Sequence, residues 1–134
     1  MSIGGIGSAG ITTVRDIEEI VVNIDGGGSV IATGALNRFY AISWAGTISG
    51  WYLTGNPSGS IVIDVWRKNG ANPSVADTIT TSKPTLSGAT FAKVDPINPA
   101  QWSVNCVPGD VFGFNVDSAS GVTSAVLTIQ ITRN

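Results

Sequence analysis

Turn-forming sequences recur along this chain at short intervals and leave little room for a stable helix between them. The clearest lie at Asp25–Ser29 (DGGGS), Gly55–Gly59 (GNPSG), Pro108–Asp110 (PGD) and Ala119–Gly121 (ASG). Glycine accepts the positive φ angles that tight turns require, while proline, asparagine and aspartate favour turns for their own steric and hydrogen-bonding reasons. This punctuation predicts many short strands joined by turns.

Within the runs between turns, apolar and polar residues alternate, as in strands with one buried face. The inward sets of three C-terminal runs are Trp102, Val104 and Cys106; Phe112, Phe114 and Val116; and Ala125, Leu127, Ile129 and Ile131. Only Val14–Ile20 has helical character, and it is too short to be stable alone. We therefore expect an all-β protein, an antiparallel β-sandwich of jelly-roll-like type with about nine short strands.

The length of 134 residues fits one domain with a sizeable core. Residues 1–17 are predicted to be a flexible or docking arm, and residues 18–134 a single β-sandwich domain. The stretch Lys83–Ala100 holds three of the six prolines. It is predicted to be a long connection of the kind that crosses between sheets.

One predicted strand, Ser60–Trp66, is apolar on both faces. Alternation assigns Ile61, Ile63 and Val65 to the core and Val62, Asp64 and Trp66 to the opposite face. The run before it, Gly46–Thr54, is also apolar both ways, with Trp51 and Leu53 on one side, Ile48 and Tyr52 on the other and a bulge expected at Gly50.

Two neighbouring strands of this kind suggest a sheet that is covered on both sides. Three covers are compatible with the pattern: a loop of the same chain such as Lys83–Ala100, another subunit or partner, or a ligand. Val62, Asp64, Trp66 and Trp51 are therefore candidate interface residues. Asp64 is expected to be a structural anchor that accepts hydrogen bonds from a neighbouring loop or pairs with a positive group such as Arg38.

Charge is scarce: 12% of residues are charged, and the formal net charge is −2. We therefore expect neither nucleic acid nor a membrane as partner, and no apolar run reaches the ~18 residues of a membrane-spanning helix. Low charge fits either a surface of Ser, Thr, Asn and Gly or a surface that an assembly covers.

The residues that usually carry catalysis are few, because the chain has no histidine and one cysteine. Cys106 lies in an apolar strand pattern and is expected to be a buried, inert thiol. We predict no enzymatic activity, no cofactor and no metal site. A carboxylate pair for glycoside hydrolysis and a calcium site from Asp25, Asp110 or Asp117 are the less favoured alternatives. The nine carboxylates lie mostly at turns or strand ends, where they are expected to accept turn hydrogen bonds.

Tryptophan and tyrosine offer a further alternative, a platform on which sugar rings stack. The aromatic residues concerned are Trp44, Trp51, Trp66, Trp102, Tyr40 and Tyr52. Packing in the core or at an interface is favoured, because no evident ring of polar side chains frames them.

The series GTISGWYL, SIVIDVW, VADTIT, KPTLS and GDVFGFNVDS, in this order, resembles a small β-sandwich module of tailed-bacteriophage virion proteins. The resemblance covers Glu18–Arg133, and the combination of segments is more specific than any one of them. It implies a virion structural protein without catalytic residues.

The resemblance favours a capsid decoration or cement protein that binds and stabilises the assembled head. The alternative is a tail-fibre or receptor-binding module that recognises host surface glycan. The implied partners are sister subunits, with a trimer favoured by class analogy, and the major capsid protein or another virion protein. Residues 1–13 lack the pattern of a secretory signal, so we expect synthesis in the host cytoplasm and final location in the virion, on the capsid surface or in the tail or fibre. Ile3, Ile6 and Ile11 would anchor the arm by burial against a neighbour.

Overall fold

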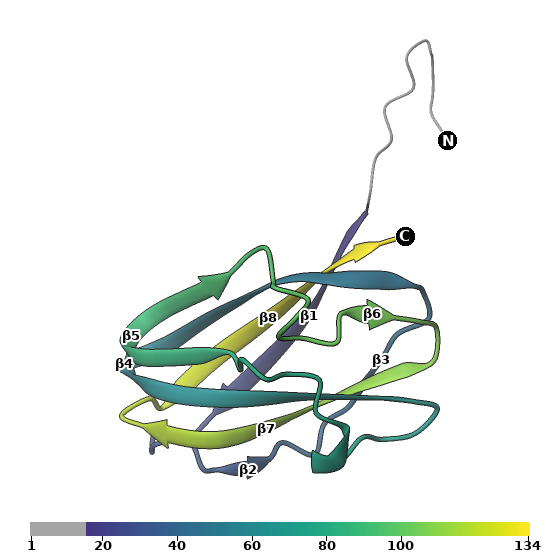
Figure 1. Ribbon diagram of the computed structural model, residues 1–134. Helices are drawn as coiled ribbons and strands as arrows, with labels where there is room; N and C mark the ends of the chain where they lie inside the picture. Colours follow the sequence, from purple (N-terminus) through teal and green to yellow (C-terminus); the bar gives the residue numbers. More distant parts are fainter. Residues whose placement is uncertain (1–15) are drawn as a thin grey trace.

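A computed structural model describes residues 16–134 and shows an antiparallel all-β fold (Figure 1). Its elements are β1 (Ile17–Asp25), β2 (Gly34–Ala35), β3 (Tyr40–Ala41), β4 (Gly46–Asn69), the 3-10 turn η1 (Val75–Asp77), β5 (Thr85–Val94), β6 (Asn105–Cys106), β7 (Asp110–Ser120) and β8 (Ser124–Arg133). The expected all-β, sandwich-like class is confirmed, with eight strands in the described part of the chain. No helix within residues 16–134 has the length and apolar character to cross a membrane.

The long strand β4 organises the fold because it pairs with β8 along its first half and with β7 along its second. Gly46, the first residue of β4, pairs with Arg133 of β8, and Asn69, the last residue of β4, pairs with Asp110 of β7. The sequence Gly55–Gly59, predicted to separate two strands, instead lies inside β4, where the ribbon bends. The two halves of β4 therefore do not pair with each other as neighbouring strands.

Glycine is required at this bend. A Cβ atom on Gly59 would lie 2.5 Å from the main-chain oxygen of Ser120 and 2.9 Å from the main-chain nitrogen of Val122. Backbone atoms of the opposite strand cannot move aside as the end of a flexible side chain can. Gly59 thus allows β4 and the β7–β8 corner to approach closely as they turn together.

The bend curls the sheet into a half-barrel with strand order β1-β8-β4-β7-β2. β3 pairs with β7, whereas β5 and β6 pair with β4. In Figure 1, β1, β8 and the first half of β4 lie above the second half of β4, β7 and β2. The space between the two halves is the core.

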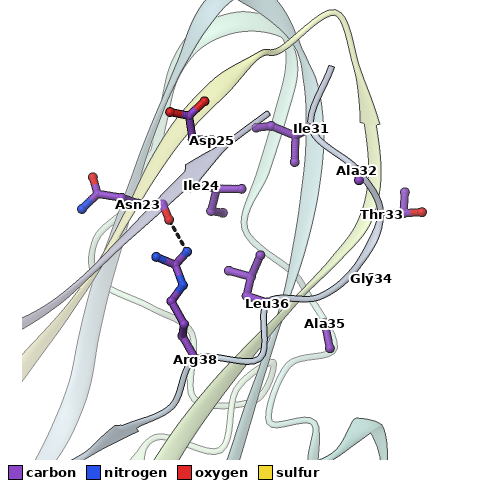
Figure 2. A pocket seen from close by; sticks show the side chains of 10 residues that line it. All are labelled: Asn23, Ile24, Asp25, Ile31, Ala32, Thr33, Gly34, Ala35, Leu36 and Arg38. Carbon is purple, nitrogen blue, oxygen red and sulfur yellow. Dashed lines mark hydrogen bonds between the residues drawn. The ribbon is translucent and has the colours of Figure 1, made fainter. Parts of the chain in front are cut away.

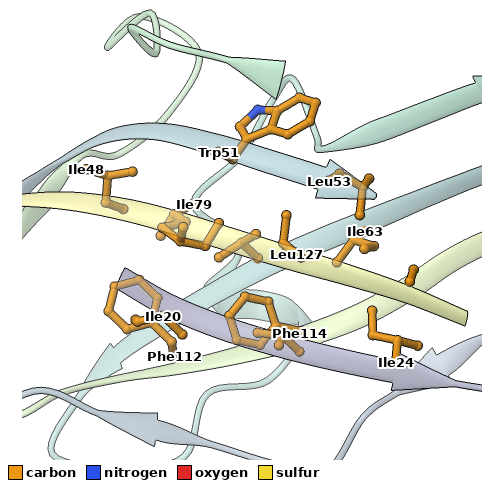
Figure 3. Packing of buried hydrophobic residues seen from close by; sticks show 14 of the residues in the cluster. Ile20, Ile24, Ile48, Trp51, Leu53, Ile63, Ile79, Phe112, Phe114 and Leu127 are labelled. Atoms are coloured by element: carbon orange, nitrogen blue, oxygen red, sulfur yellow. The ribbon is translucent and has the colours of Figure 1, made fainter. Parts of the chain in front are cut away.

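The core consists of the inward side chains that alternation predicted (Figure 3). Phe112, Phe114, Val116, Leu127, Ile129 and Ile131 are all buried. The bulge expected near Gly50 is present, between Ile48 and Gly50. It places Ile48 in the core together with Trp51 and Leu53, so the prediction that Ile48 faces the opposite side was wrong.

Other local predictions differ from the structure. Ile17–Ile20 is the start of β1, not part of a short helix. The connection predicted at Lys83–Ala100 contains a ten-residue strand, β5, and the strand expected at Gln101–Val107 is reduced to β6. Within the predicted arm, Ile17 belongs to β1, while Ile3, Ile6 and Ile11 lie outside the described residues.

Candidate functional site

The predicted interface on the outward side of β4 is buried beneath the protein's own chain. Trp66 is 6% exposed, Trp51 5% and Asp64 3%, and only Val62 is partly exposed. Trp51 faces the core, whereas Trp66 lies opposite Gly113 on the other face. Proposing Trp51, Asp64 and Trp66 as a surface for another molecule was therefore incorrect for this conformation.

The outward face near Trp66 is covered by other parts of the same chain, but not by the Lys83–Ala100 stretch. Trp66 pairs with Gly113, and a Cβ on Gly113 would lie 3.1 Å from side-chain atoms of Phe39 and Pro73. Beside Trp66, Thr78 forms a β-bridge with it, and the Ile79 N–H donates to the Val65 oxygen at 3.0 Å. A short extended piece of the chain thus pairs with the edge of β4.

Asp64 is the hydrogen-bonded anchor of this edge segment. Its Oδ1 accepts hydrogen bonds from the hydroxyls of Thr78 at 2.6 Å and Thr80 at 2.9 Å, and its Oδ2 accepts one from Trp66 Nε1 at 3.0 Å. The Lys83 ammonium lies 3.8 Å from Oδ2. These partners satisfy the carboxylate that burial would otherwise destabilise.

The positive group near Asp64 is Lys83, not Arg38. Lys83 also donates to Asp117 Oδ2 at 2.6 Å, and this hydrogen bond is the main reason that the pKa of Lys83 lies above its ordinary value. Arg38 lies elsewhere and donates to the main-chain oxygen of Asn23. The group around Asp64 holds Thr78 and Thr80 beside β4.

A second buried carboxylate, Asp110, fastens the turn before β7. Its Oδ2 accepts a hydrogen bond from the Val107 N–H at 2.9 Å and lies 3.5 Å from Arg67 Nε. Arg67 also donates to the Ser103 oxygen at 2.7 Å. Asp110 is thus an internal clamp. No group of three or more potential ligands gathers for a metal among residues 16–134, and Asp25, Asp110 and Asp117 do not converge.

Cys106 is buried beside this clamp. Burial raises the pKa of its thiol to about 11. A thiol in this environment is protonated at neutral pH and hence a poor nucleophile.

The tryptophans do not form an exposed sugar platform either. The Trp102 indole donates to the Ser82 oxygen at 2.8 Å and is buried, as are Trp51 and Trp66. Trp44 is partly buried, and the Arg133 guanidinium lies 5.8 Å from its ring centre.

One hollow is visible between the end of β1 and the segment 31–38 (Figure 2). It has a volume of about 510 Å³ and is open to solvent, with Ile24, Ile31 and Leu36 beneath and Asp25 and Arg38 at the rim. Because these side chains include no histidine, cysteine or paired carboxylates, they provide no nucleophile with an activating base.

A sheet face in the first half of the fold, on the side away from the core, remains exposed, and sequence reasoning missed it. We call it the outer face and define it by seven residues: Val21, Asn23, Tyr52, Thr54, Phe91, Val126 and Thr128. Strand register places them in two rows: one crosses β1, β8 and β4 and continues to Lys93 on β5, and the other crosses all four strands and ends at Phe91 on β5. Val21 is 46% exposed and Phe91 54%.

Charged side chains border the outer face, and Lys93 on β5 pairs with Tyr52 at the end of one row. Glu19 lies beyond one end, and the Lys93 ammonium lies 5.8 Å from the Tyr52 ring centre at its margin. The Tyr52 hydroxyl donates to Asp95 Oδ2 at 2.5 Å, and this hydrogen bond is the main cause of the raised pKa of Tyr52. The sequence signal was present in β1, where Val21 alternates with buried Ile20 and Val22, but the neighbouring strands could not be known.

No protein-family model matches this chain, and no curated protein matches its sequence.

Proposed function

We propose that this protein is a bacteriophage virion structural protein, a capsid decoration protein that binds the assembled head and stabilises it. The sequence resemblance supports the assignment to a virion. The single structural observation in its favour is the outer face, on which Val21 and Phe91 are exposed and charged side chains lie only at the margins.

A sheet surface with apolar and small polar side chains is suited to contact with another protein. Its backbone is held by register on β8 and β4, so little conformational entropy is lost when a partner binds. Burial of an apolar side chain contributes up to about 1.5–3 kcal/mol. Phe91 and Val21 can therefore supply affinity, with Thr54 and Thr128 between them as small neutral contacts.

The alternative, a tail-fibre or receptor-binding module for glycan, has less structural support. It relied on Trp51 and Trp66 as exposed stacking rings, and both are covered. We therefore place the contact on the outer face and the partner among the proteins of the head.

Adsorption to heads of the phage that encodes the chain tests this proposal. Phe91→Lys places a charge at the β5 side of the contact and is expected to weaken adsorption at least about tenfold, since an unpaired buried charge costs several kcal/mol. Val75→Lys is the matched control, because Val75 is 69% exposed on η1, outside the outer face. If wild-type protein fails to adsorb, or if both variants adsorb as it does, the proposal is wrong.

A further inference from the structure

The outer edge of β1 has main-chain groups without a strand partner. β1 ends the strand order, and no strand in the described part of the chain pairs along its outer edge. At its two ends, the Arg133 N–H donates to the Asp16 oxygen and the Gly26 N–H donates to the Thr123 oxygen. Bonded pairs alternate in an antiparallel ladder, so the even-numbered residues of β1 bond to β8.

The odd-numbered residues therefore direct their N–H and C=O groups away from β8. Arg38 uses one of these groups, since its guanidinium donates to the Asn23 oxygen. Ile17, Glu19 and Val21 remain, and their side chains are all exposed. This edge is three pairing positions long and ends at the Arg38 contact.

The charge at this edge is negative. Glu18 and Asp16 lie within 3.5 Å and 3.8 Å of Arg133 Nη1. Glu19 forms no ion pair with any residue from 16 to 134, and it lies between the apolar side chains of Ile17 and Val21. A strand that extends the sheet would place its own side chains directly opposite these three.

A second copy of the chain fits this edge poorly. The antiparallel register that sets Ile17 opposite Val21 also sets Glu19 opposite Glu19, and like charges in that position are destabilising. Shifting the register to place Glu19 opposite Val21 sets Ile17 opposite Asn23, whose oxygen Arg38 occupies. Charge complementarity instead favours a partner strand with a basic residue.

We propose that the edge of β1 at Ile17, Glu19 and Val21 binds an extended segment of a partner protein by strand addition. The segment carries Lys or Arg opposite Glu19 and apolar side chains opposite Ile17 and Val21. This inference deepens the proposed function, on which it rests, by naming the chemistry of the partner. Main-chain hydrogen bonds supply affinity, and the alternate side chains supply specificity.

Amide hydrogen exchange of the full-length protein with a synthetic peptide tests the proposal. The capped probe TVTKTIT sets Val, Lys and Ile opposite Val21, Glu19 and Ile17 in antiparallel register. At about 1 mM probe, enough to occupy sites of micromolar affinity, exchange at these three amides should slow at least about tenfold. The amides of Ile20 and Val22, already bonded to β8, are internal controls. No slowing overturns the proposal, as does equal slowing by TVTETIT.

Two variants test the mode of binding. Glu19→Lys alters an exposed side chain and should reverse the preference, so that TVTETIT protects the edge better than TVTKTIT. Val21→Pro removes one outward N–H without breaking a bond to β8, because proline is tolerated where the N–H faces solvent. Unchanged protection of Ile17 and Glu19 in this variant contradicts strand addition.

Other occupants have distinct signatures, and each of them overturns the proposal. If the three amides are protected in the free protein and deletion of residues 1–15 exposes them, the chain's own N-terminal segment occupies the edge. If protection without peptide rises with protein concentration, a second copy does.

Head adsorption separates failure of this inference from failure of the proposed function. Wild-type, Glu19→Lys and Val21→Pro proteins that adsorb equally well leave the decoration function intact and refute the edge as its contact. Wild-type protein that does not adsorb at all refutes the decoration function.

Discussion

The carboxylate of Asp64 accepts a hydrogen bond from the Thr78 hydroxyl at 2.6 Å, and this contact fastens the segment that pairs with the edge of β4. Asp64→Ala removes the acceptor for Thr78, Thr80 and the Trp66 indole and leaves Lys83 without its buried partner. We expect the free energy of unfolding to fall by about 3–5 kcal/mol, the cost of breaking a buried charged network. Urea denaturation measures it.

Asp117→Asn is the matched control for Asp64→Ala. It removes the other carboxylate that faces Lys83, but Asp117 is exposed, so the expected loss is at most about 1 kcal/mol. Equal losses in the two variants would contradict the role of Asp64 as the anchor.

Because of Cys106, we expect the free energy of unfolding to decrease as pH rises in the alkaline range. Burial raises the pKa of the thiol from 9.0 to about 11. Below pH 9 the thiol is protonated in both states; between pH 9 and about 11 the unfolded chain ionises first, so stability falls as pH rises. The loss should approach about 3 kcal/mol by the upper end of this window.

Cys106→Ala separates this effect from other alkaline titrations. Tyr52 and Lys83 also have pKa values raised above their ordinary 10.0 and 10.5, so their contributions begin to be lost within the same alkaline range. Denaturation curves at several pH values should therefore show a gentler decline above pH 9 in Cys106→Ala than in the wild type. Identical declines would contradict the assignment.

Thiol reactivity gives an independent check on Cys106. A pKa of about 11 in place of 9.0 lowers the thiolate fraction at neutral pH about 100-fold. Native protein should react with a thiol reagent at least that much more slowly than unfolded protein. A native rate within about tenfold of the unfolded rate would contradict burial of the thiol.

Gly59→Ala tests the bend of β4. The added Cβ would meet main-chain atoms of Ser120 and Val122, so we expect a loss of roughly 3 kcal/mol or more. Gly28→Ala is the control: Gly28 has φ +88 with no atom within 4 Å of a Cβ, so the change carries only a local cost of about 1–2 kcal/mol. Losses of equal size would mean that close packing at the bend is not what requires Gly59.

The alternation of apolar and polar residues predicted which side chains of β7 and β8 are buried. In a strand, the face on which a side chain lies follows from its position along that strand alone. It could not predict that β4 continues through Gly55–Gly59, since a turn signal and a bend within a long strand share the same residues. The sequence also could not predict which residues surround Asp64 and Trp66. Thr78 and Thr80 resemble ordinary polar positions until Asp64 is found beside them.

The outer face could be read only when strand order was known. Val21, Val126 and Phe91 come from three distant parts of the sequence and meet through register with β8 and β4. Apolar residues are most numerous in β4, and the sequence therefore drew attention to that strand. The fold buries most of them for the same reason.

A density map of the intact virion is the most direct test of whether this protein decorates the head through its outer face. The account predicts this β-sandwich at regular positions on the head, with Val21 and Phe91 turned toward a neighbouring protein. Density confined to the tail tip, or a sandwich on the head whose outer face meets only solvent, would contradict it.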